Sequence, residues 1–222
     1  MQLLDPAYVH SSLRRLISQE AKIIGANGHD FRLNPRLLDS KLQQFEESHA
    51  VKLPVDYAHF LTRIGNGGAG PDYGVFPLGL MDGTSSDLEP WRENEGMIGK
   101  LSEPFLLNDA WNDLTLQPTD ELLEKDQKEY DRLIEEFDKV YWNQARMNGA
   151  IPICHMGCAL RIWLIVTGEQ AGHLWRDGRA EFVGLSPLLL QDGSRASFSS
   201  WYQEWLDHSL LAAQLSRSTL PH

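Results

Sequence analysis

The stretch 53–78 sets the strongest limit on how this chain can fold. Pro54 fits the first turn of a helix, where its missing N–H has no consequence. The apolar residues after it recur at the spacing of one helical face: Tyr57, Phe60, Leu61 and Ile64. Gly65 and Asn66 tolerate the left-handed conformation that ends a helix. The sequence therefore predicts a helix, a glycine-rich loop and a short edge strand at 75–78.

The glycine loop also contains a literal dinucleotide-binding pattern, G-x-G-x-x-G, at Gly65, Gly67 and Gly70. That pattern binds phosphate only when a strand precedes the loop and a helix follows it, because the positive helix N-terminus must face the anion. Here a helix ends in the loop, so carbonyl groups and the negative end of the dipole face it. The order of elements therefore argues against nucleotide binding.

Several motifs in the same order resemble the SUKH superfamily, which includes yeast Smi/Knr-type regulators and bacterial toxin-immunity proteins. The resemblance covers about residues 37–206. Its blocks are Phe45-Glu46, Leu53-Pro54, Asp56-Tyr57, Phe60-Leu61, Gly65-Asn66-Gly67-Gly68, Pro71, Tyr73-Gly74, Phe76-Pro77-Leu78, Ile151-Pro152-Ile153-Cys154, the stretch 172–177, Phe198, Trp201-Tyr202 and Trp205-Leu206.

This resemblance implies an α+β fold with a bent antiparallel sheet of about five or six strands. Helices are expected on one face of the sheet, and the other face is expected to be partly open. It also implies a protein that is not an enzyme and has no cofactor. Bacterial members neutralise a toxin, often a nuclease, by occluding its active site, whereas yeast members are regulatory or scaffold proteins.

The length of 222 residues suits one domain, which we place at 1–215, with an insertion at about 82–148 and a frayed tail at 216–222. The N-terminus has charged residues and no apolar run, so no signal peptide is expected. Two cysteines suit a reducing cytoplasm. A net charge of −11 disfavours nucleic acid and anionic membranes as direct partners and favours a basic protein.

Helical spacing and capping residues predict four further helices. One spans 6–24, and a second is capped by Asn34 with Pro35 at its first position. Thr119 caps a long helix to about residue 148, whose segment 120–139 has nine acids and four bases. Ser197 caps the last helix, whose apolar row should lie on the sheet: Phe198, Trp201, Tyr202, Trp205 and Leu206.

Alternating or continuous apolar runs predict the strands. The dipeptide Asp177-Gly178 indicates a tight hairpin turn, and successive hairpins indicate antiparallel pairing. Together with 75–78 and a short segment at 104–107, the predicted strands are 151–155, 160–167, 173–175 and 181–183.

The candidates for chemistry are Cys154, His155, Cys158 and His173. Zinc sites commonly separate paired cysteines by two residues, but here three residues intervene and no second pair exists. Two ordinary cysteines are therefore the simpler interpretation, and a metal- or thiol-dependent enzyme stays as an alternative function.

The best candidates for partner binding lie in an acidic, glycine-rich segment of the insertion. Aromatic anchors in polar surroundings are typical of binding hot spots. The sequence therefore predicts contacts from Asp82, Asp87, Glu89, Trp91, Glu93 and Glu95 to a basic toxin domain.

Overall fold

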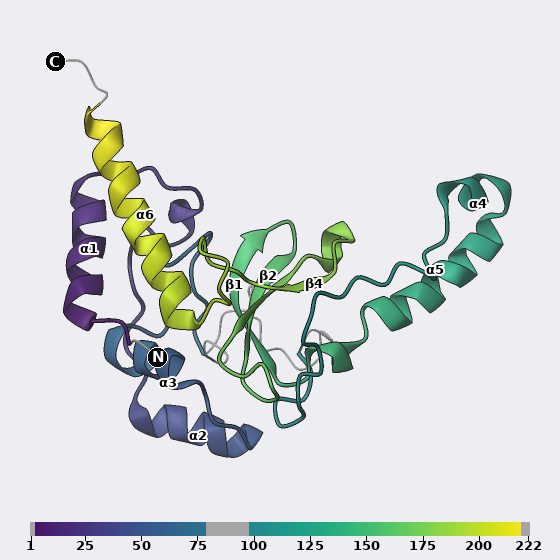
Figure 1. Ribbon diagram of the computed structural model, residues 1–222, viewed down its shortest axis with the longest axis horizontal. Helices are drawn as coiled ribbons and strands as arrows, with labels where there is room; N and C mark the ends of the chain where they lie inside the picture. Colours follow the sequence, from purple (N-terminus) through teal and green to yellow (C-terminus); the bar gives the residue numbers. More distant parts are fainter. Residues whose placement is uncertain (1–2, 79–97, 219–222) are drawn as a thin grey trace.

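The computed structural model describes residues 3–78 and 98–218 of the chain. It is an α+β structure with a four-stranded antiparallel meander in the order β1-β2-β3-β4 and helices around it (Figure 1). The strands are β1 (Ala150–Gly157), β2 (Leu160–Ile165), β3 (Leu174–Asp177) and β4 (Leu185–Pro187). The predicted fold class and antiparallel pairing are confirmed.

The expected number of five or six strands is not reached among the described residues. The segments 75–78 and 104–107 make isolated bridges, Val75 to Cys154 and Phe105 to Gly168. Each segment contains a proline, which cannot donate a ladder hydrogen bond. Both segments therefore make isolated bridges and do not form strands.

The last hairpin is longer than the Asp177-Gly178 signal predicts. A short helix, η5 (Arg179–Glu181), follows the glycine, and 181–183 is not a strand. The Asp177 carboxylate accepts bonds from the Arg179 backbone N–H and guanidinium, at 2.7–3.1 Å. This buried pair folds the chain back on itself, so β4 begins only at Leu185.

One side of the sheet is covered by the N-terminal helices and the last helix. These are α1 (Pro6–Ser18), α2 (Asp39–His49), α3 (Val55–His59), η2 (Phe60–Ile64) and α6 (Phe198–Ser218), with a short η1 (Ala26–Gly28) between α1 and α2. α6 lies beside α1 and contacts α3 (Figure 1). The predicted apolar row is present on α6. At its start, the Phe198 ring packs on the rings of Tyr57 and Phe60, with centroids 4.9 Å apart in both pairs.

Two predicted helix boundaries are wrong for local reasons. α1 ends at Ser18, and Glu20 already has a positive φ of 48°. α2 starts at Asp39, because Asn34 is used elsewhere. The Asn34 backbone N–H donates to the Gly67 carbonyl, and its side-chain amide donates to the Asn66 carbonyl.

The glycine loop closes the helix in a different way from the prediction. Gly65 is extended, with φ −175°, and its N–H donates to the Phe60 carbonyl in a π-type turn. The left-handed residues come later, Gly67 at +79° and Gly68 at +97°. Gly68 bridges both Leu33 and Val75, so the loop ties the N-terminal helices to the sheet.

The predicted long helix of the insertion is two helices, α4 (Asp120–Lys125) and α5 (Gln127–Tyr141). Thr119 caps the first as expected, and Asp126 breaks the run and caps the second by accepting a bond from the Glu129 N–H. A further short helix, η4 (Gln144–Met147), leads to β1. We call residues 119–142 the arm, because α4 and α5 extend away from the sheet (Figure 1).

The sheet is buried on both faces, so the expectation of a partly open face is wrong. One cluster joins the N-terminal helices and α6 to sheet residues such as Ile153, Ile162 and Leu164. The second lies on the opposite face, where Phe105 and Met147 of the insertion cover Ala150, Trp163, Ile165, Trp175 and Leu185. Part of the insertion is therefore core, not an appendage.

None of the helices in the described part of the chain combines the length and the apolar character needed to cross a membrane.

Candidate functional site

The six predicted partner-binding residues all fall in 79–97: Asp82, Asp87, Glu89, Trp91, Glu93 and Glu95. They lie outside the described residues. Binding through this segment stays a prediction.

The candidate cysteines and histidines are not gathered into one site. Cys154 is buried and donates to the Pro71 carbonyl at 3.3 Å, whereas Cys158 is exposed in the turn between β1 and β2. His173 follows the far end of β2, where its carbonyl accepts a bond from the Ile165 N–H. Over residues 3–78 and 98–218, no group of three or more His, Cys, Asp or Glu could hold a metal ion.

The thiol of Cys154 is also a poor nucleophile. Complete burial and the nearby Asp72 carboxylate raise its pKa well above the ordinary value. Because only the thiolate is reactive, this cysteine behaves as a small core residue.

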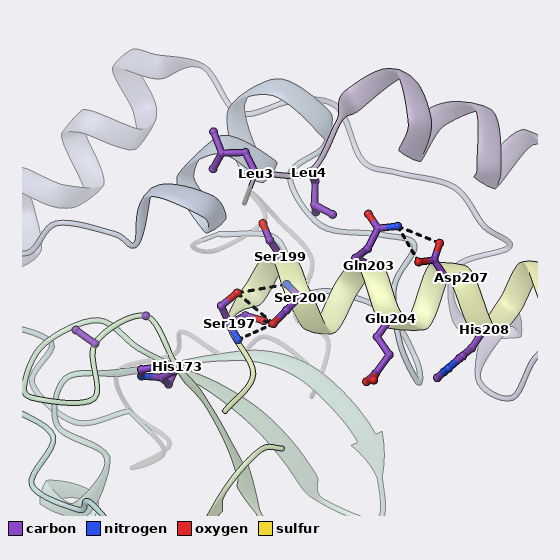
Figure 2. A pocket seen from close by; sticks show the side chains of 12 residues that line it. Leu3, Leu4, His173, Ser197, Ser199, Ser200, Gln203, Glu204, Asp207 and His208 are labelled. Atoms are coloured by element: carbon purple, nitrogen blue, oxygen red, sulfur yellow. Dashed lines mark hydrogen bonds between the residues drawn. The ribbon is translucent and has the colours of Figure 1, made fainter. Parts of the chain in front are cut away.

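A pocket of about 700 Å³ lies along the first turns of α6 (Figure 2). It is lined by Leu3, Leu4, Ala171, Gly172, His173, Ser197, Ser199, Ser200, Gln203, Glu204, Asp207 and His208. The Ser199 hydroxyl and the His173 Nδ1 are buried in it, and neither has a hydrogen-bond partner among the described residues. Most of the other polar side chains that line the pocket form hydrogen bonds that hold α6 in place.

The α6 N-terminus in this pocket is already neutralised. The Ser199 N–H donates to the buried carboxylate of Asp56 at 3.0 Å, and Ser197 and Ser200 bond each other reciprocally. A helix N-terminus attracts anions through its free N–H groups, and a carboxylate from α3 occupies that role here. The pocket is therefore not a ready phosphate site.

The rim of the pocket holds α1 against α6. The Tyr8 hydroxyl donates to Asp207 at 2.5 Å, and this bond raises the pKa of Tyr8. The Gln203 amide donates to the same carboxylate at 2.9 Å, as Figure 2 shows. The Ser197 and Ser200 hydroxyls bond each other, and within the described residues no serine hydroxyl is paired with His173, so the lining forms no nucleophile–base pair.

A different kind of surface lies where the arm joins the body. We call it the arm-root surface, and it consists of three exposed apolar side chains: Trp142 (41%), Phe182 (43%) and Val183 (56%). It joins the end of α5 to the loop after η5. The Phe182 ring lies 6.1–6.2 Å from the rings of Phe137 and Tyr141.

The arm-root surface is held in place by polar bonds and by stacking. Asn112 donates to the Phe182 carbonyl and accepts from the Tyr141 hydroxyl, both at 2.8 Å. The Arg179 guanidinium lies 5.1 Å from the Trp142 ring centre, within cation–π range. Phe182 has φ +55°, a strained value for a bulky residue. Its exposed ring is therefore presented in a fixed position.

Comparison of the chain with protein-family models, with curated proteins and with solved structures finds no match. The SUKH resemblance therefore rests on the motifs of the sequence alone.

The predicted binding residues lie elsewhere in the chain, and neither Trp142 nor Phe182 is among them. One signal was available for Trp142, an aromatic residue directly after the strongly charged segment 120–139. No comparable signal existed for Phe182, because its exposure depends on the buried Asp177–Arg179 pair that lengthens the hairpin.

Proposed function

We propose that this chain is a protein-binding immunity protein that neutralises a toxin domain by covering its active site. The main support is the arm-root surface, where two exposed aromatic rings are fixed beside an acidic arm. Trp, Tyr and Arg dominate binding hot spots, and Trp142 is an exposed residue of this type that contacts the buried guanidinium of Arg179. The motif resemblance described above points to the same class of function.

Charge supports a basic partner. The arm segment 120–139 has nine acids and four bases, and several acids on α5 are exposed, including Asp131, Glu135 and Asp138. An acidic surface speeds encounter with a basic one and disfavours acidic partners. A nuclease toxin has a basic cleft for its nucleic acid, so the arm would compete with the substrate for that cleft.

The internal geometry supports rigid docking. Because Phe182 and Trp142 are already fixed in the free protein, little side-chain entropy is lost on binding. The two rings would then contribute most of the residence time, and the acids most of the association rate.

The test is co-expression of the chain with the toxin encoded by the neighbouring gene. We expect growth rescue and a stable complex on gel filtration. Replacing Trp142 or Phe182 alone by alanine should weaken the complex by about 30-fold, and replacing both by up to about 1,000-fold, because each hot-spot ring contributes about 2 kcal/mol. Lack of rescue, with no complex for the unaltered chain, would show that the proposal is wrong.

A matched control separates binding from folding. Leu211 is 54% exposed on α6, and Leu211→Ala removes a similarly exposed apolar side chain away from the arm. This variant should bind like the unaltered chain. If Leu211→Ala and the double variant lose binding equally, the arm-root surface is not the site of contact.

A further inference from the structure

We propose that a groove beside α1 binds an acidic peptide segment in which carboxylates alternate with apolar side chains. The groove has a volume of about 680 Å³ and runs between α1 and the segment 31–36. Every charged or titratable side chain in its lining is basic: His10, Arg14, Arg32 and Arg36. This local charge is opposite to the net charge of −11 of the whole chain.

The three arginines are available for a ligand. Arg14, Arg32 and Arg36 are exposed, and none of them forms an ion pair within residues 3–78 and 98–218. Other arginines of the chain are engaged, such as Arg63 with Asp39. A free guanidinium binds a carboxylate through two parallel hydrogen bonds, so the groove can recognise several acidic side chains.

The floor of the groove is apolar. Leu13, Phe31 and Ile64 are buried beneath it, and Ile17 is 46% exposed at its side. A second groove of about 690 Å³ shares Ile17, Phe31 and Arg32 and continues to Ile24, which is 91% exposed. Apolar side chains of a peptide would cover these isoleucines while its carboxylates meet the arginines.

The charges also give the peptide a direction. The continuation of the groove contains Glu20 and Asp30 together with Lys22, so its charge is mixed. The carboxylates of the peptide therefore belong at the arginine end, and its uncharged part belongs near Ile24. A long nucleic acid would have to lie beside these acids on a strongly acidic protein, which costs electrostatic free energy.

This surface does not depend on the proposed function. α1 and the arm lie at opposite ends of the molecule (Figure 1), so both surfaces can be occupied at once. The chain would then link a basic partner at the arm to an acidic partner at α1.

The test is fluorescence anisotropy with the full chain and a fluorescein-labelled peptide of alternating glutamate and leucine. We expect saturable binding that weakens with salt, because exposed ion pairs are screened. Arg14→Gln, Arg32→Gln and Arg36→Gln should each weaken binding about two- to fivefold, and the triple variant by at least about tenfold.

Arg15→Gln is the matched control. Arg15 is the next residue on α1 and is also exposed, but it lines a different groove beside Asp207. Its removal changes the net charge equally and should leave peptide affinity within about twofold. If Arg14→Gln and Arg15→Gln lower the peptide affinity equally, the binding depends only on the overall charge, and the proposal is overturned.

Two competitors identify the ligand. A peptide with glutamine in place of glutamate should not bind, and neither inorganic phosphate nor an oligouridylate should displace the acidic peptide. Tighter binding of the oligouridylate than of the acidic peptide would overturn the peptide assignment. Absence of acidic-peptide binding to the unaltered chain would overturn the site itself, whatever the result at the arm.

Discussion

Replacing Asp56 should destabilise the protein more than its small size suggests. The carboxylate is completely buried at the start of α3. One of its oxygens accepts from the Tyr57 N–H at 2.9 Å, and the other accepts from the Ser199 N–H at 3.0 Å. A single side chain therefore joins α3 to the N-terminus of the longest helix, α6.

The magnitude follows from these two bonds. Asp56→Ala leaves two N–H groups without their acceptor, each costing about 1–3 kcal/mol when buried. It also removes a negative charge from the α6 N-terminus, worth up to about 2 kcal/mol in a buried geometry. We expect a total loss of about 4 kcal/mol, which lowers the melting temperature by about 8–16 °C for a chain of this size.

Asparagine should restore only part of this stability. Because each oxygen of Asp56 accepts a different N–H, the amide nitrogen of asparagine must face one of these donors. We expect Asp56→Asn to cost about 2–3 kcal/mol, between the unaltered chain and the alanine variant.

Urea unfolding followed by circular dichroism measures both changes, with Asp39→Ala as control. Asp39 is exposed and pairs with Arg63 at 3.1 Å, and such pairs are worth at most about 1 kcal/mol. An Asp56→Ala variant that unfolds within about 1 kcal/mol of the unaltered chain would refute the assigned role of the carboxylate.

Three further predictions concern the loop, the thiols and a histidine. Gly68→Ala should cost at least about 2 kcal/mol in urea unfolding, because φ is +97° and a Cβ would lie 2.5 Å from a backbone oxygen; a neutral effect contradicts the observed conformation. A thiol reagent should modify Cys158 in the folded protein and Cys154 only after unfolding, since burial raises the pKa of Cys154; equal rates would contradict this. Burial lowers the pKa of His29 below 6.5, and its Nδ1 accepts from the Phe31 N–H. The unfolded state then binds more protons, so the contribution of His29 to the free energy of unfolding is fully present above pH 6.5 and is lost as the pH falls toward the pKa of the folded state. His29→Gln should therefore reduce the pH dependence of the free energy of unfolding in this range. An unchanged pH dependence would show that another group causes it.

Local patterns predicted the antiparallel pairing of the sheet and two of the helix caps. Thr119 and Ser197 cap helices as expected, and the pairing of β1 with β2 follows from the apolar run at 160–165. These features depend on neighbours in sequence. Features set by distant contacts were missed, such as the use of Asn34 to hold the glycine loop in place of a helix cap.

The residues that cover the second face of the sheet could not be predicted from local sequence patterns either. The alternation in β2 shows that Trp163 needs burial, but not that Phe105 and Met147 of the insertion provide it. The arm-root surface was missed for the same reason, because Phe182 is exposed only through the buried pair of Asp177 with Arg179. Residue patterns identify which side chains need partners, and tertiary contacts decide which partners they find.

The division of the arm into a supported base and an unsupported tip has a consequence for protein engineering. The buried side chains of α5 are Phe137 and Tyr141, both near its end, and α4 has none. Substitutions in α4 therefore leave the hydrophobic core intact, whereas changes at Tyr141 disturb it. We therefore expect that a different sequence can be grafted in place of α4 without loss of the folded domain.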